Sequence, residues 1–286
     1  MSKTMVDNFA QRRRRNATMF TLTAVFTGIS LTFLFAILGY IAYHGLTAIN
    51  LNFLVKLPVP LGETGGGIAN SIVGSAKVVG LACVMGLPIG ILGAVYLAEF
   101  GDNRIGFAIR YCADVLNGVP SIVMGIFAYT IVVLPMGHFS ALSGSVALTV
   151  IMIPLILRTA EEFIRLVPGS IREAALALGI SQWKVITRIV LPTAARGIMT
   201  GAILAVSRIA GETAPLIFTA FGNRFWDAGL MKPIATLPHT IFTYAIAPYD
   251  DWHRQAWAAA LILMLVVLVG NVTARILMKP DRGAAH

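Results

Sequence analysis

Long apolar runs separated by short polar segments make up most of the chain. A membrane-spanning helix needs about 20 predominantly apolar residues. Six runs approach or exceed that length: 17–43, 70–98, 111–134, 142–158, 194–219 and 255–278. We expect every run to be α-helical, because a spanning segment must satisfy its backbone hydrogen bonds internally. The third run contains Gly118-Val119-Pro120-Ser121, which predicts an interruption within that span. The pattern predicts an all-α polytopic membrane protein with six transmembrane helices.

The remaining residues divide into a basic N-terminus and the connections between spans. Residues 1–16 are polar, and residues 17–286 are expected to form a single transmembrane domain with a core at about 67–278. The connecting segments are 44–68, 99–110, 135–141, 165–192 and 220–254. We read 99–110 and 135–141 as short turns. The longest segment, 220–254, predicts one short amphipathic helix near 234–247.

The segment 170–192 carries the strongest local signals outside the spans. Ser170 followed three residues later by Glu173 is typical of a capping box, which predicts a helix beginning near residue 171. Gly179 occupies a position where a left-handed residue would end that helix. Ser181 is placed to cap a second helix that runs to about residue 191, and Pro192 then opens the next segment. The sequence predicts a compact helix–turn–helix between two spans.

Composition supports the membrane assignment and excludes a large soluble domain. The 286 residues are 57% hydrophobic and 12% charged, whereas soluble domains are roughly 45–50% apolar and about 25% charged. The mean hydropathy is +0.80. Cys83 and Cys112 lie in or beside apolar runs, without the spacing of a metal or redox site, and are read as structural thiols.

The basic residues indicate how the chain is oriented. The formal net charge is +9, and cytoplasmic loops of membrane proteins collect Lys and Arg. With both termini in the cytoplasm, the inner segments hold most of the basic residues: Arg12 to Arg15, Arg104, Arg110, those of 158–196, Lys279 and Arg282. The outer segments hold only Lys56, Arg224, Lys232 and Arg254. A nucleic-acid-binding protein would need these charges on a soluble surface, which the pattern does not provide.

The helix–turn–helix segment resembles the EAA loop of ATP-binding-cassette importer permeases. The resemblance rests on Glu173-Ala174-Ala175, Gly179, Ile189, Leu191 and Pro192, which match the spacing of that motif. It implies the MetI-like permease fold and coupling helices that contact a separate ATPase. Small Ala174 and Ala175 would let a partner surface approach closely, while Glu173 could serve as a helix cap alone, or cap and contact the partner together. The sequence has no phosphate-binding loop with a Gly-Lys-Ser/Thr ending. We therefore expect no enzymatic activity in this chain, no cofactor or metal site of its own, and ATP and Mg²⁺ bound by the partner ATPase.

Two charged residues lie inside the fifth predicted span. Arg208 and Glu212 are four residues apart, so in a helix they would share one face. Charges at membrane depth cost roughly 2.5–3.5 kcal/mol on insertion scales and usually serve a function. The arginine fork suits phosphate oxygens, and Glu212 would hold it and weaken anion binding. The alternative is an ion pair that only packs the bundle. Arg158 and Glu161, three apart near the inner end of span four, are a second such pair, for which simple positive-inside anchoring is the alternative.

Three runs resemble one branch of these permeases, the PstA-type subunits of phosphate importers. The runs are Asn117-Gly118-Val119-Pro120-Ser121-Ile122-Val123, Leu157-Arg158-Thr159-Ala160-Glu161-Glu162 and Arg208-x-x-Gly211-Glu212-Thr213-Ala214-Pro215. The resemblance implies a translocation path that includes Arg158, Glu161, Arg208, Glu212, Thr213, Asn117 and Ser121. It also implies three partners in the bacterial inner membrane system: a homologous second permease (PstC-like), a homodimeric ATPase (PstB-like) and a periplasmic or lipid-anchored phosphate-binding protein (PstS-like).

Two other functions remain open at this point. The first is a permease of the same fold for another oxyanion, such as phosphonate, sulfate or molybdate, because the arginine–glutamate pair does not identify the anion. The second is an ATP-independent carrier or channel. That class has no reason to keep the complete EAA pattern in a cytoplasmic loop.

Overall fold

The computed structural model describes residues 3–60, 63–226 and 229–277, and these residues are almost entirely helical. In chain order the elements are α1 (Lys3–Leu46), α2 (Leu51–Val55), α3 (Ala69–Glu99), α4 (Arg104–Gly118), α5 (Ser121–Ala128), the π-helical turn η1 (Tyr129–Val133), α6 (Leu134–Met136), α7 (Ala141–Arg165), α8 (Gly169–Ala177), α9 (Gln182–Val185), the π-helical turn η2 (Ile186–Val190), α10 (Leu191–Ala210), α11 (Ala214–Thr219), α12 (Leu237–Ala245) and α13 (Asp250–Leu277). Lys279 and Arg282, which contribute to the predicted topology, lie outside the described residues.

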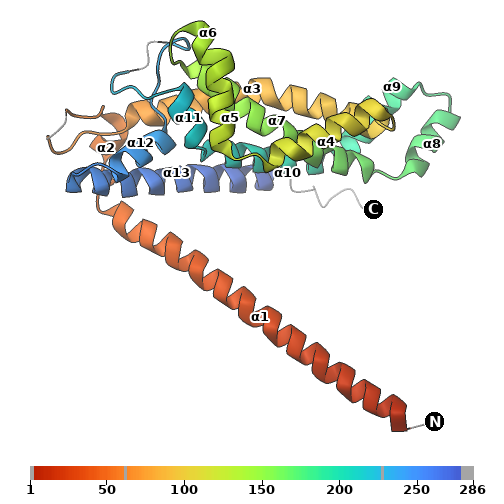
Figure 1. Cartoon of the computed structure of the whole chain (residues 1–286). Helices are drawn as coiled ribbons and strands as arrows, with labels where there is room; N and C mark the ends of the chain where they lie inside the picture. The colour runs from red at the N-terminus through yellow and green to blue at the C-terminus, as the bar shows by residue number, and fades with distance from the viewer. Residues whose placement is uncertain (1–2, 61–62, 227–228, 278–286) are drawn as a thin grey trace.

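Within the described residues, five helices are long and apolar enough to cross a membrane, and the bent pair α4 and α5–α6 makes a sixth if counted as one span. The predicted all-α class with six spans is therefore confirmed. Figure 1 shows α8 and α9 at one end of the bundle and α2 and α12 at the other. The connection predicted as a helix–turn–helix and the long 220–254 segment thus lie at opposite ends.

Helices α3 and α7 form the centre of the bundle. Small residues recur every four positions on α3 where it meets α7: Ala82, Gly86, Gly90 and Ala94, all buried. A Cβ atom on Gly90 would lie 2.8 Å from Ile156 Cγ2 of α7, so only glycine permits this approach. Close backbone packing through small residues is how transmembrane helices associate without a hydrophobic driving force.

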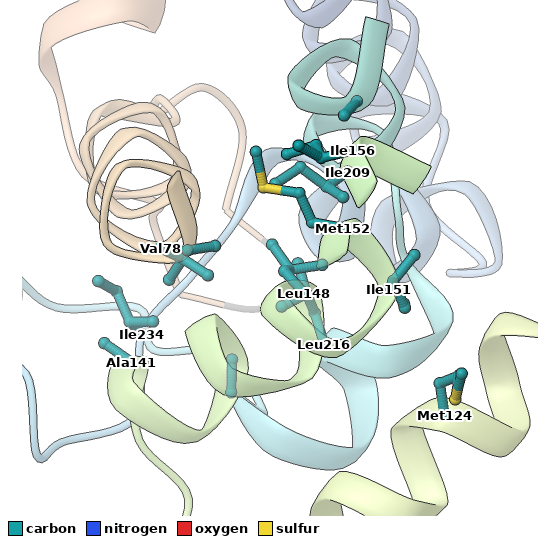
Figure 2. Close-up of a cluster of buried hydrophobic side chains, with 13 residues drawn as sticks. Val78, Met124, Ala141, Leu148, Ile151, Met152, Ile156, Ile209, Leu216 and Ile234 are labelled. Carbon is teal, nitrogen blue, oxygen red and sulfur yellow. The ribbon is translucent and has the colours of Figure 1, made fainter. Parts of the chain in front are cut away.

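The largest buried cluster surrounds the middle of α7. Leu148 and Met152 of α7 are fully buried among side chains from α3, α5, α10 and α11, as Figure 2 shows. Among these neighbours are Val78, Met124, Ile209 and Leu216. Two interrupted spans, α4–α5 and α10–α11, therefore both pack on one central helix.

Helix α1 lies apart from this bundle. None of its most apolar window is buried, and Figure 1 shows it extending away from the other helices. Its C-terminal end contacts α13, where Tyr40 meets the Trp257 ring at 5.3 Å and His44 meets it at 5.7 Å. The first span is confirmed as a helix, and it begins well before the predicted residue 17, because the basic N-terminal residues continue the same helix.

Several predicted boundaries between spans and connections were wrong. The turn predicted at 99–110 is much shorter: α4 begins at Arg104, and the Asn103 side chain accepts a hydrogen bond from Gly106 N at 2.8 Å as its N-cap. Helix α7 runs beyond the predicted residue 158 to Arg165. The 220–254 segment does contain its predicted short helix, α12, but α13 already begins at Asp250.

Candidate functional site

The helix–turn–helix segment ends its first helix as predicted but begins it differently. Gly179 has a φ of +77°, and two backbone bonds close the turn: Gly179 N to Leu176 O and Ile180 N to Ala175 O. This bonding pattern is a Schellman motif. The predicted capping box at Ser170 was wrong, because α8 already starts at Gly169 after Pro168, and no side chain caps it. Proline pre-sets the entry to the helix without a side-chain cap.

The two alanines of the EAA motif face opposite ways. Ala174 and Glu173 are exposed, whereas Ala175 is 5% exposed and packs with Val185 and Ile186 inside the hairpin. The expectation that a partner approaches both alanines is therefore wrong for Ala175, and for Ala174 it stays a prediction. Large apolar side chains are exposed on the same hairpin: Leu178 is 81% exposed and Trp183 is 66% exposed. An apolar patch of this kind is typical of a protein–protein contact.

The second helix of the hairpin does not end before Pro192. Residues Gln182–Ala210 form one long helix through α9, η2 and α10. The π-helical turn η2 precedes Pro192, and Leu191 N bonds to Ile186 O. The wider turn accommodates Pro192, whose ring would otherwise clash with the carbonyl of Arg188. At 1.5 Å per residue, the continuous helix places Arg208 roughly 40 Å from the hairpin turn.

Arg208 and Glu212 lie at a break in the fifth predicted span. The expected uninterrupted span 194–219 was wrong: α10 ends at Ala210 and α11 begins at Ala214. Pro215 explains the break, since its ring disfavours a helix through the carbonyl of Gly211 four residues earlier. Arg208 Nε and Glu212 Oε1 are 3.8 Å apart, with side chains 46% and 16% exposed. This loose contact leaves the guanidinium with unused donors.

The predicted site residues Asn117, Ser121 and Thr213 lie at the two helix interruptions. Asn117 belongs to the last turn of α4, and Ser121 starts α5 after a bend of 108° between the two halves of the span. Thr213 precedes α11. Helices α5 and α11 touch closely: a Cβ on Gly125 would lie 2.7 Å from Pro215 Cα. Irregular backbone at membrane depth is tolerated only where it is buried in protein or lines a water-filled cavity.

Arg158 and Glu161 belong to a separate ionic network. Glu161 is 2% exposed and accepts hydrogen bonds from three arginines: Arg110 Nε at 2.6 Å, Arg158 Nη1 at 2.9 Å and Arg165 Nε at 3.0 Å. Arg158 also donates to Asp114 at 2.8 Å. The network joins two helices, because Arg110 and Asp114 belong to α4. Arg158, Glu161 and Arg165 belong to α7.

The structure does not bring the two predicted ion pairs together. A Cβ on Gly201 of α10 would lie 2.7 Å from Thr159 Oγ1 of α7, so Arg158 sits at about the level of Gly201. Arg208 is seven residues further along α10, about 10 Å at the rise of an α-helix. Within the described residues, no hydrogen bond or ion pair joins Arg158 to Arg208 or Glu212.

The sequence pattern did not identify Arg110 as a partner of Glu161, although Arg110 also donates to Leu97 O and Gly101 O. It also did not identify the separate ion pair between Arg172 and Glu99. The available signal was the scarcity of carboxylates: the chain has 13 Asp and Glu against 22 Lys and Arg. Carboxylates at span ends in such a chain are expected to have arginine partners.

The end of the bundle that carries α2 and α12 contains an open pocket of about 250 Å³. It is lined by residues of α3, α12 and the 220–235 segment, including Asn70, Arg224 and His239. Burial lowers the pKa of His239. Burial also raises the pKa of Tyr244, and the Arg224 charge opposes that effect. In the described parts of the chain, no three His, Cys, Asp or Glu side chains are grouped so as to hold a metal ion.

Residues 86–279 match the family described as the binding-protein-dependent transport system inner membrane component. The chain is 42% identical over 269 residues to the phosphate transport system permease protein PstA of Yersinia pestis, covering 94% of this chain and 91% of that protein. It is 43% identical over 273 residues to the protein of the same name from Xylella fastidiosa strain Temecula1, covering 94% of each.

Solved structures share the fold at low sequence identity. A chain of a bacterial alginate ABC transporter, crystallised with an alginate pentasaccharide-bound periplasmic protein, aligns with a TM-score of 0.68 and 14% identity, covering 93% of this chain and 95% of that chain. A chain of the inward-facing MetNI methionine ABC transporter aligns with a TM-score of 0.55 and 19% identity, covering 74% and 95%. These likenesses confirm the ABC importer permease fold.

Proposed function

The chain belongs to the PstA family of binding-protein-dependent transport permeases, and from that premise we propose that it is the transmembrane subunit of an ATP-driven importer of inorganic phosphate. It forms the translocation path together with a homologous second permease chain. A phosphate-binding protein delivers the anion at the outer end. The chain resides in the bacterial inner membrane with both termini in the cytoplasm.

The observation that carries this proposal is the single long helix Gln182–Ala210. One end begins in the exposed hairpin with the EAA motif, and the other end carries Arg208 beside the break at Gly211–Thr213. A helix is stiff over this length, so a displacement of the hairpin reaches Arg208 without an intervening hinge loop. The helix thus connects a surface suited to a protein partner with a charge at membrane depth.

The hairpin is the surface that we assign to the ATPase. Its exposed Leu178 and Trp183 offer apolar contact area, while Glu173 and Ala174 are accessible beside them. Gly179, Ile189, Leu191 and Pro192 shape the hairpin and its exit into α10 rather than all contacting the partner. ATP and Mg²⁺ bind to that partner, since this chain has no phosphate-binding loop in its sequence.

The path for phosphate passes the two helix interruptions. Arg208 is half exposed and bonds loosely to Glu212, so its planar donors remain available for anion oxygens. Asn117, Ser121 and Thr213 add polar groups at the same interruptions. Nearer the cytoplasm, Arg158 lines the exit, and Glu161 holds that arginine in place. Release requires weak binding, which a guanidinium shared with a carboxylate provides.

Uptake of labelled phosphate into proteoliposomes tests the proposal. The vesicles contain the full complex of this chain, the second permease and the ATPase, with the phosphate-binding protein outside. We expect uptake that requires both ATP and the binding protein and that sulfate, phosphonate and molybdate do not compete away. Uptake of one of those anions in preference to phosphate would favour the alternative, a permease of this fold for another oxyanion. Uptake without ATP would contradict the importer class itself.

A further inference from the structure

The EAA helix α8 has a second attachment to the bundle, formed by one arginine. Arg172 donates to Glu99 Oε1 through Nε at 3.2 Å and through Nη2 at 2.9 Å. The same side chain donates to Val167 O at 2.6 Å and to Ile164 O at 2.8 Å. Glu99 is the last residue of α3, and Ile164 lies in the last turn of α7. A single side chain of α8 therefore binds the inner ends of both central helices.

The contact is buried on one face of α8. Glu99 has an 8% exposed side chain and Arg172 a 21% exposed one. Ala175, one turn further, is buried on the same face, while Leu178 and Trp183 are exposed. The surface assigned to the ATPase and the surface that carries Arg172 are therefore different, and Arg172 itself does not need to touch the partner. Charge-assisted hydrogen bonds of this kind are the strong ones in proteins.

Helix α3 extends this contact to the opposite end of the molecule. Near its N-terminus, Ser71 Oγ lies 2.7 Å from Thr240 Oγ1 of α12, and Ser75 Oγ accepts from Leu237 N at 2.7 Å. Between these ends, α3 packs along α7 through its small residues. Helix α3 therefore connects Glu99 with α12, which lies at the end of the bundle opposite to α8 (Figure 1).

We propose that Arg172 and Glu99 are positioning residues that transmit the movement of α8 to α3 and α7, in parallel with the continuous helix into α10. This inference rests on the proposed function, because it assigns a second mechanical connection to the same coupling hairpin. The continuous helix moves Arg208 and the fifth span. The Arg172–Glu99 pair moves the second and fourth spans together with α8. The central helices α3 and α7 therefore change position at the same time as Arg208.

The experiment measures phosphate imported per ATP hydrolysed by the reconstituted full complex. Arg172→Gln and Glu99→Gln each remove one charge, and Asp102→Asn is the matched control, because Asp102 lies close to Glu99 in the chain but has a 91% exposed side chain. We expect both test variants to assemble and hydrolyse ATP while the ratio falls about tenfold, which corresponds to the loss of charged hydrogen bonds. The control keeps the wild-type ratio.

The double variant shows whether Arg172 and Glu99 act through each other or affect the ratio of phosphate to ATP independently. If the residues act through each other, Arg172→Gln combined with Glu99→Gln lowers the ratio no further than either change alone. A wild-type ratio in both single variants, or a double variant whose defect is the product of the two, would overturn the proposal. A merely stabilising role would lower complex yield without changing the ratio.

The conservative variants cover the case in which loss of a charge prevents assembly. Arg172→Lys keeps the charge but cannot make all four bonds, and Glu99→Asp shortens the carboxylate arm. We expect a reduced ratio in each, and an unchanged ratio in both would count against transmission. If vesicles with the wild-type complex import no phosphate, the proposed function is contradicted. If they import phosphate and the variants keep the wild-type ratio of phosphate to ATP, only the role of this pair is contradicted.

Discussion

The charges at the contact between α4 and α7 and the charges at the break in the fifth span are arranged in opposite ways. Glu161 is 2% exposed and is held by three arginines within 3.0 Å. Arg208 is 46% exposed, and its contact with Glu212 is 3.8 Å long. Both groups contain an arginine and a glutamate at helical spacing, so their sequence patterns are alike. Their bonding differs because one carboxylate joins two helices and the other faces an interruption.

The difference separates a carboxylate that is fully paired within the protein from an arginine that is only loosely paired. A buried carboxylate with three arginine partners occupies donors that an anion would need, and removing its charge leaves several uncompensated positive charges. A long, half-exposed contact contributes little to stability and leaves donors unused. We therefore assign stability mainly to the Glu161 network and anion binding mainly to Arg208.

The largest expected effect follows from removing the Glu161 charge. Glu161→Gln leaves three arginines around an uncharged group, and breaking a buried ion pair costs about 3–5 kcal/mol. We expect a large loss of complex yield and a lower unfolding temperature in detergent. Glu162→Gln, which removes the exposed carboxylate of the adjacent residue, is the control and should change neither. Wild-type stability of Glu161→Gln would show that the network is not structural.

Arg208→Gln should give the reverse result. The loose pair with Glu212 contributes at most about 1 kcal/mol, so the complex should assemble with wild-type yield. We expect phosphate uptake to be abolished, because the planar donor fork is lost. Arg208→Lys, which keeps the charge without the fork, should retain part of the activity. Undiminished uptake by Arg208→Gln would count decisively against an anion site at this position.

A smaller effect is expected at the turn of the coupling hairpin. Gly179 has a φ of +77° and nothing within 4 Å of an added Cβ, so the cost of a substitution is conformational rather than steric. Gly179→Ala should lose about 1–2 kcal/mol locally and weaken copurification of the ATPase. Gly179→Asn is the matched control, since asparagine tolerates this conformation better. Equal behaviour of the two variants would show that the left-handed turn is unimportant for coupling.

The smallest expected effect lies at the pocket near α12, where the His239 side chain is partly buried. Burial lowers the pKa of His239 in the folded protein, so below about pH 6.5 the unfolded chain binds more protons than the folded one. Stability should therefore fall as the pH is lowered from 7.5 to 5.5. His239→Gln should reduce that dependence, whereas the same change at the exposed His138 should not. Thermal unfolding at the two pH values measures the difference.

The helix interruptions show how far the sequence supports prediction. Gly118 and Pro120 correctly predicted a break in the third span. Gly211 and Pro215 form a similar pair, yet the break between α10 and α11 was not predicted. Proline alone is a poor guide, because Pro88 lies within unbroken α3 and Pro154 within unbroken α7. A neighbouring glycine does not separate the two cases either, because Gly86 precedes Pro88 by two residues, as Gly118 precedes Pro120, and α3 is nevertheless unbroken.

The candidate site was predictable in its residue types and not in its grouping. The EAA motif and the two arginine–glutamate pairs could be identified from residue spacing, and the family assignment followed from them. The three-arginine coordination of Glu161 could not, because Arg110 is 51 residues away in the chain. The Arg172–Glu99 contact spans 73 residues. Local spacing carries no information about such partners.

By itself, the sequence determined the membrane class, the number of spans, the position of the hairpin with the EAA motif and its left-handed turn at Gly179. These features depend on hydrophobic run length, the basic residues of loops and the backbone preferences of single residues, all of which are local. Only the tertiary structure decided which charges are saturated and which remain available. That outcome depends on which helix ends meet. The small residues of α3 pack against α7, and this packing brings Glu99, Glu161 and their arginine partners to one end of the bundle. Arg208 lies too far along α10 to contact them.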